Sequence, residues 1–227
     1  ITWLNSLNIM KDGPNIFLAN EFFDALPIKQ FIKKNNKWFE KKIKTVSKNN
    51  FELVDTITNI QNLEKKIGIN LSNNQKIIEF SPLTYKYLNI ISKKINSFHG
   101  GLLIIDYGYL EKKMKNSLQS VYKHKFNQIL ENFARSDITY NISFHLLKKI
   151  TKKLNLKVAG LATQKDFLTK LGIVQRAEII SKNLQFSKKA DIYYRLKRLI
   201  DNKFMGELFK VMFITKKNNK FKLGFKN

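Results

Sequence analysis

Two continuous apolar runs, each followed directly by acidic residues, constrain the fold of this chain more than any other feature. The first run is 16–19 (IFLA) and the second is 102–105 (LLII). Runs of this length without polar alternation are typical of short strands that are covered on both faces, as in a parallel sheet. A helical pattern precedes the second run, so the sequence predicts an α/β fold.

Polar side chains follow both predicted strands. Asn20, Glu21 and Asp24 come after the first strand, and Asp106 and Tyr107 come after the second. In open α/β sheets, ligands bind beyond the carboxyl ends of the strands, so we expect Asn20, Glu21 and Asp106 around one crevice. Carboxylates there could hold a cationic or N–H-rich group. The alternative is that these side chains only cap turns and helix ends.

Weaker patterns predict the remaining elements. A hairpin is expected over 28–46, because the asparagines at 35 and 36 suit its turn. Ser81 and Pro82 predict the start of a helix that closes at the glycines 100 and 101. Further strands are expected at 51–54, 75–80, 156–162 and 208–215, and further helices at 60–67, 144–154, 164–171, 176–183 and 188–200. The stretch from Tyr109 to Ser117 is expected to be a charged loop.

The composition narrows the function classes. The net charge is +25, yet nearly all the basic residues are Lys, and Lys occurs with abundant Asn and Ile. This bias is expected from an AT-rich genome, so no specific nucleic-acid partner is predicted. The sequence also contains no apolar run long enough for a membrane span, no cysteine and no histidine pair at metal-ligand spacing. We therefore predict no membrane span and no metal site.

Six motifs in order resemble the MidA-like family of S-adenosylmethionine-dependent methyltransferases. That family includes a mitochondrial complex I assembly factor that methylates a protein arginine. The motifs are ANEFFDALP at 19–27, GGLLIIDYG at 100–108, LQSVYKH at 118–124, SDIT at 136–139, ATQKDFLTKLGI at 162–173 and MGELFKVM at 205–212.

The resemblance implies a class I methyltransferase-like, Rossmann-like sheet, in which 16–19 and 102–105 are the fourth and fifth strands. The segments 156–162 and 208–215 would supply the last, antiparallel strands. Residues 28–80 would form a β-hairpin and helical insertion. The glycine-rich cofactor loop is absent from these residues and would lie upstream of residue 1. Residues 1–227 would then be the C-terminal portion of one methyltransferase domain, inactive alone.

The resemblance also implies roles for individual residues. Glu21 would hold the planar guanidinium of an arginine in line with the methyl donor, with Asn20 and Asp24 as further catalytic residues. Asn20 and Phe22 would contact S-adenosylmethionine. The expected substrate-binding residues are Asp106, Tyr107, His124, Asp137 and Gln164.

The implied function is arginine N-methylation of a respiratory complex I-type or similar protein, which would be the partner. One alternative is a non-catalytic assembly or chaperone module that keeps the fold. The other is a nucleic-acid-binding protein, suggested by the charge. The expected location is the bacterial cytoplasm, with the mitochondrial matrix as the alternative.

Overall fold

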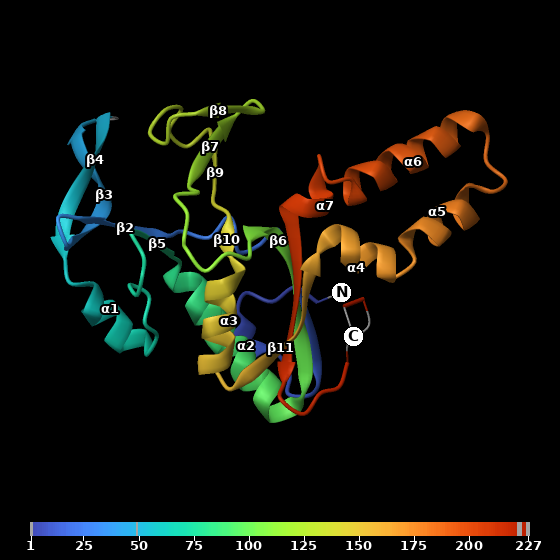
Figure 1. The fold of residues 1–227 in the computed structure, drawn as a ribbon, viewed down its shortest axis with the longest axis horizontal. Helices are drawn as coiled ribbons and strands as arrows, with labels where there is room; N and C mark the ends of the chain where they lie inside the picture. The colour runs from blue at the N-terminus through green and yellow to red at the C-terminus, as the bar shows by residue number, and fades with distance from the viewer. Residues whose placement is uncertain (1, 49, 222–223, 226–227) are drawn as a thin grey trace.

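A central mixed sheet organises the computed structural model, which describes residues 2–48, 50–221 and 224–225 (Figure 1). Its strand order is β1-β6-β12-β11, and the short β10 pairs with the end of β6. β1 runs parallel to β6, whereas β12 runs antiparallel to both of its neighbours, β6 and β11. The bounds are Asn15–Asn20 for β1, Gly100–Tyr109 for β6, Ile142–Ser143 for β10, Leu156–Thr163 for β11 and Phe209–Lys216 for β12. This arrangement confirms the predicted Rossmann-like sheet.

β6 is longer than the sequence predicts. The prediction ended this strand at Ile105, but it continues through Asp106 to Tyr109. The reason is pairing on both sides, because β12 pairs with residues as far as Tyr107 and β10 pairs with Gly108 and Tyr109. Asp106 therefore lies inside a strand, and Tyr109 does not belong to the following loop.

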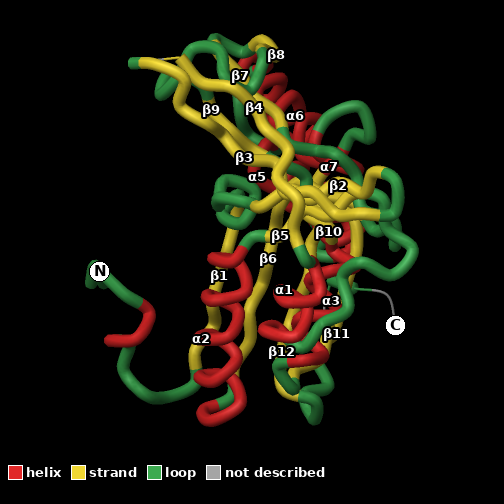
Figure 2. Tube along the Cα trace, turned by 90° about the vertical axis from the view of Figure 1, so that its left-hand side faces the viewer, coloured by secondary structure: helices red, strands yellow, loops and turns green. Residues whose placement is uncertain are grey.

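Helices cover both faces of the sheet. α2 (Pro82–Phe98) and α3 (Phe144–Lys153) pack on one face, and α4 (Gln164–Lys170) and α7 (Met205–Leu208) pack on the other (Figures 1 and 2). α2 begins as predicted, because the Ser81 hydroxyl caps the Thr84 amide at 3.1 Å and Pro82 occupies the first turn. α5 (Ile173–Ser181) and α6 (Phe186–Ile200) form a helical pair that extends from α4.

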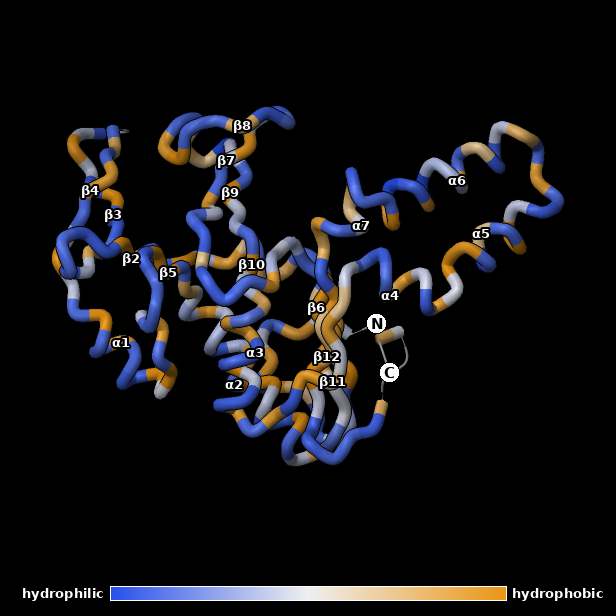
Figure 3. Tube along the Cα trace, viewed as in Figure 1, coloured by the Kyte–Doolittle hydropathy of each residue, from blue (hydrophilic) through white to orange (hydrophobic). Residues whose placement is uncertain are grey.

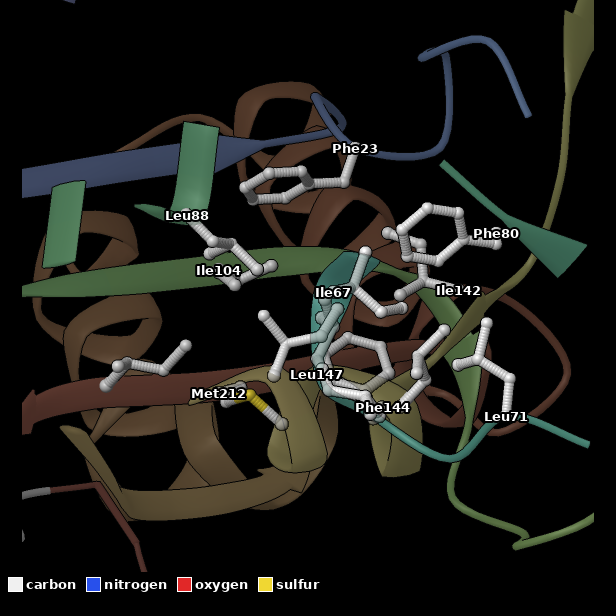
Figure 4. Packing of buried hydrophobic residues seen from close by; sticks show 14 of the residues in the cluster. Phe23, Ile67, Leu71, Phe80, Leu88, Ile104, Ile142, Phe144, Leu147 and Met212 are labelled. Carbon is white, nitrogen blue, oxygen red and sulfur yellow. The ribbon is translucent and has the colours of Figure 1, made fainter. Parts of the chain in front are cut away.

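The main core lies between the sheet and the α2–α3 face. Figure 4 shows Phe23 from the loop after β1, Leu88 from α2, Ile104 from β6 and Met212 from β12 packed together. Each of these side chains is at least nine-tenths buried, and burial of a side chain of this size stabilises the fold by roughly 1.5–3 kcal/mol. The loop that follows β1 is thus anchored by its own phenylalanine.

A second sheet is inserted between β1 and α2. Its order is β4-β3-β2-β5, and the predicted hairpin is confirmed as β2 (Lys29–Lys34) and β3 (Lys37–Ser47). Asn35 and Asn36 both adopt positive φ in the turn, as expected. The remaining elements are β4 (Asn50–Thr58), α1 (Ile60–Ile67) and β5 (Ile77–Phe80), and α1 ends at the left-handed Gly68.

A third, three-stranded sheet was not predicted. Its order is β8-β7-β9, with β7 at Gln119–Tyr122, β8 at Lys125–Asn127 and β9 at Asp137–Thr139. It stands beside the β3–β4 hairpin, beyond the carboxyl end of β6 (Figure 1).

Among the described residues, no helix has the length and apolar character that a membrane span requires.

Candidate active site

An acidic edge forms where β1 ends beside β6, and Glu21 is its exposed member. The Glu21 amide donates to the Ile105 carbonyl at 3.0 Å, and its φ is 46°. A left-handed glutamate is uncommon, and such strained residues cluster at functional sites. The side-chain amide of Asn20 lies 3.4 Å from Glu21 Oε1. The backbone thus turns sharply and leaves both Asn20 and Glu21 open to solvent.

Asp106 lies behind this turn and is completely buried. Its Oδ2 accepts a hydrogen bond from the Phe23 amide at 3.0 Å, and its Oδ1 accepts one from its neighbour Tyr107 at 2.9 Å. Burial, and then the charge of Asp24, raises the pKa of Asp106 to about 7. Asp106 therefore fixes the loop after β1 and binds a proton near neutral pH.

Asp24 is the second buried carboxylate. Its backbone carbonyl accepts a hydrogen bond from the Tyr140 amide at 3.2 Å, while its Oδ1 has no hydrogen-bond partner among the described residues. Burial and then the charge of Glu21 raise the pKa of Asp24. The charge of Asp24 in turn raises the pKa of Asp106. Asp24 is therefore electrostatically coupled to both Glu21 and Asp106.

Tyr107 extends the edge toward β12. Its ring centroid lies 4.1 Å from that of Phe209. Burial, and then the charges of Glu21 and Asp24, raises the pKa of the Tyr107 hydroxyl, so this group keeps its proton and can donate a hydrogen bond. The structure thus brings together five of the predicted site residues, which are Asn20, Glu21, Asp24, Asp106 and Tyr107. Asp24 and Asp106 are buried, however, so they lie behind the exposed edge, and Asp106 does not line an open crevice as the sequence predicted.

An aromatic wall lies next to the acidic edge. Phe22 is partly exposed, and its ring centroid lies 5.2 Å from that of Phe23 and 5.4 Å from that of Tyr87. Phe22 and Asn20 line a hollow of about 440 Å³ together with Leu7 and other apolar side chains. The lining of the hollow thus combines apolar side chains with the polar Asn20 at the end of β1.

The remaining predicted residues lie elsewhere. His124 is exposed in the β7–β8 turn with a φ of 63°, and Asp137 is exposed on β9. No described hydrogen bond or ion pair links either side chain to the acidic edge. Gln164 is buried at the start of α4, where its amide donates to the Leu199 carbonyl at 2.9 Å and so ties α4 to α6. The proposed substrate contacts of these three residues stay predictions.

Tyr140 is a residue that the sequence reasoning missed. It is buried, its amide contacts Asp24, and burial raises the pKa of its hydroxyl. The only available signal was its position directly after the SDIT motif.

Within the described ranges, no group of three or more histidine, aspartate or glutamate side chains is arranged to hold a metal ion.

Solved structures share the whole fold. A crystal structure of an uncharacterized protein from Burkholderia thailandensis superposes with a TM-score of 0.82 at 18% identity, covering 100% of this chain and 61% of that one. A second structure from this species is described as a likely methyltransferase bound to S-adenosyl-homocysteine. It gives a TM-score of 0.76 at 17% identity and covers 100% of this chain and 57% of that one. The described chain therefore shares its fold with both of these proteins.

Sequence comparison gives the family. Residues 1–162 match the family described as putative S-adenosyl-L-methionine-dependent methyltransferases, and the chain belongs to that family. The Caenorhabditis elegans protein named as a homolog of the mitochondrial protein arginine methyltransferase NDUFAF7 is 31% identical, over 78% of this chain and 42% of its own length. The Danio rerio NDUFAF7 is 27% identical, over 92% of this chain and 49% of its own length. The chain thus spans about half the length of the curated relatives it matches.

The residues present suit part of an S-adenosylmethionine site. The hollow beside Phe22 offers an aromatic wall and the Asn20 amide, which fit a ligand with both an apolar ring system and polar groups. The chain contains no glycine-rich nucleotide loop in its sequence. These residues could therefore hold only one side of such a cofactor.

Proposed function

We propose that the protein containing this chain is an S-adenosylmethionine-dependent methyltransferase that methylates arginine in a protein of the respiratory complex I type or a similar one. The observation that carries the proposal is the exposed Glu21 on a left-handed turn, backed by the buried Asp24 and Asp106. Membership of the methyltransferase family and the names of the curated relatives support it.

The acidic edge would act on the methyl acceptor. A guanidinium is planar and positively charged, and an exposed carboxylate such as Glu21 can accept two of its N–H groups at once. This holds one nitrogen toward the methyl group that the cofactor supplies and keeps electron density on it. Tyr107 and Asn20 would complete the polar rim, and Asp106 would act by holding the Phe23 backbone.

The domain organisation is part of the same proposal. β1 is the edge strand of the central sheet in the described part of the chain, and Ile16 and Leu18 on one of its faces are 73% and 69% exposed. Edge strands with exposed apolar side chains are normally covered. We infer that upstream residues of the same protein pair with β1 and supply the glycine-rich cofactor loop, with 28–80 as an insertion.

Calorimetric titration with S-adenosylhomocysteine tests the proposal. The upstream-extended protein should bind with a micromolar dissociation constant, or about 8 kcal/mol, and this chain alone should not. No binding by either protein would contradict the methyltransferase and favour the non-catalytic assembly module. The proposed location is the bacterial cytoplasm, with the mitochondrial matrix as the alternative, since the names of the curated relatives call them mitochondrial.

A further inference from the structure

An apolar groove lies between the two smaller sheets. It has a volume of about 470 Å³ and runs between the β3–β4 hairpin and the segment that connects β8 to β9. We call it the inter-sheet groove. The residues used in the argument are Ile28, Ile43, Phe51, Leu118, Phe133 and Ile138, all of which line it.

The groove walls are apolar and open to solvent. Phe133 is 64% exposed and Ile43 is 59% exposed, and the ring centroids of Phe51 and Phe133 lie 4.7 Å apart. Figure 3 shows hydrophobic segments in both walls, at the hairpin end and in the loop beside β8. Contiguous apolar surface of this kind on a folded protein marks an interaction site.

The groove adjoins the acidic edge. Pro27, which also lines it, follows Asp24 by three residues, and a chain segment of that length spans at most about 10 Å. On the other wall, Ile138 lies two residues before Tyr140, whose amide donates to the Asp24 carbonyl at 3.2 Å. A polypeptide in the groove would therefore pass close to Glu21.

Charge identifies the occupant. The whole chain has 42 basic and 17 acidic residues. Strands β2 to β5 contain seven lysines and four acidic residues, whereas strands β7 to β9 contain one of each kind. A positive field attracts acidic segments and rejects basic ones. The groove thus suits an extended segment that combines an apolar anchor with acidic neighbours.

We propose that the inter-sheet groove binds an apolar side chain of the protein substrate, in an acidic segment near the arginine that is methylated. This inference rests on the proposed function, because it takes the occupant to be the methyl acceptor. It assigns substrate selectivity to residues outside the acidic edge. Leucine or phenylalanine would be the preferred anchor, since the lining is aliphatic and aromatic.

Fluorescence anisotropy with labelled synthetic peptides tests the inference on the upstream-extended protein. Each peptide has one central arginine in an Asp/Glu/Ser background, and one leucine is moved along the sequence. The distance to Glu21 predicts the best leucine about three to five residues from the arginine. That peptide should bind about tenfold more tightly than its serine counterpart, as expected for one buried leucine.

Variants connect the effect to the groove. Phe133→Ser and Ile43→Ser should each abolish most of the leucine preference. Phe126→Ser is the matched control, because Phe126 is 79% exposed on β8 and does not line the groove. If Phe133→Ser unfolds the protein, Ile43→Ser alone decides, since Ile43 is already largely exposed. Circular dichroism monitors folding in every variant.

Other results would overturn the inference. These are a leucine effect independent of position, an equal loss in Phe126→Ser, or groove variants that change only the oligomeric state by light scattering. Upstream residues that fill the groove would also remove any effect of the groove variants. Titration of S-adenosylhomocysteine into the same samples separates the two proposals, because peptide selectivity without cofactor binding supports the groove and contradicts the methyltransferase.

Discussion

At the scale of single residues, the acidic edge depends on two carboxylates that are buried next to each other. Asp106 accepts two backbone hydrogen bonds, and Asp24 has an oxygen with no partner in the described part of the chain. Burying a second charge beside the first is costly, so the pair keeps a proton near neutral pH. The exposed Glu21 is then the member of the group that stays available to a cationic ligand.

Stability should depend on this proton. The folded-state pKa of Asp106 is raised from 3.8 to about 7, so its contribution to stability is present below pH 4 and is lost as the pH rises through 7. The loss is at most about 4 kcal/mol, from ~1.4 kcal/mol per pKa unit. Urea unfolding between pH 4 and 8 measures the effect. The free energy of unfolding should fall less steeply with pH in Asp106→Asn than in the wild-type chain. Identical slopes in the two proteins would contradict the assignment.

At the scale of elements, a buried glutamate joins the inserted sheet to the rest of the molecule. Glu79 on β5 is buried, and its Oε1 accepts from Gln30 Nε2 on β2 at 2.6 Å. The same oxygen accepts the amides of Ser117 and Leu118 at 2.9 and 3.1 Å, and Oε2 accepts the Ser117 hydroxyl. The Glu79 side chain thus joins the β4-β3-β2-β5 sheet to the loop before β7, in addition to the hydrogen bonds that Gln30 and Gln75 make to that loop.

Removing this carboxylate should destabilise the fold. Glu79→Ala leaves several buried donors without an acceptor and should lower the free energy of unfolding by roughly 3–5 kcal/mol. Denaturant unfolding measures this effect. Glu52→Ala is the control, because Glu52 forms an exposed ion pair with Lys44 and its loss should cost less than about 1 kcal/mol. Equal effects of the two substitutions would show that Glu79 does not join the sheets.

The elements also show what the sequence could predict. The apolar runs of β1 and β6 and the Ser81–Pro82 start of α2 were sufficient to predict the central elements. The end of β6 was predicted wrongly because Asp106 and Gly108 resemble a turn, and only pairing with β10 and β12 extends the strand. β8 was missed because Phe126 faces solvent and the strand has no buried pattern.

The candidate site, like the fold, could be predicted from the sequence only in part. Two acid-ended strands predicted that Glu21 and Asp106 would lie around one crevice. The structure places the Glu21 amide on the carbonyl of Ile105, the residue before Asp106, but buries the Asp106 side chain completely. The contact between Tyr140 and Asp24 could not be predicted, because it joins distant segments through backbone atoms that carry no sequence signal. The groove was missed for a similar reason, since its walls come from separate sheets.

At the scale of the whole molecule, the exposed face of β1 distinguishes this chain from the longer protein that we propose. Leu18→Asp should change the stability of this chain by less than about 1 kcal/mol, because Leu18 is 69% exposed. In the upstream-extended protein the same substitution should cost about 2 kcal/mol or more, since a buried leucine would be replaced by a charge. Thermal and denaturant unfolding of both proteins measure the difference. Equal small effects would contradict the covering of this face of β1 by upstream residues.

The central claim is that Glu21 holds the arginine that receives the methyl group. Single-turnover transfer from radiolabelled S-adenosylmethionine to arginine peptides, with the product analysed by mass spectrometry, tests it in the upstream-extended protein. Glu21→Gln should lower the rate about a hundredfold or more, as expected when one partner of a charged pair is lost. Its affinity for S-adenosylhomocysteine and the rate of the control Glu52→Gln should stay unchanged. A wild-type rate in Glu21→Gln, or methylation of residues other than arginine, would contradict the claim.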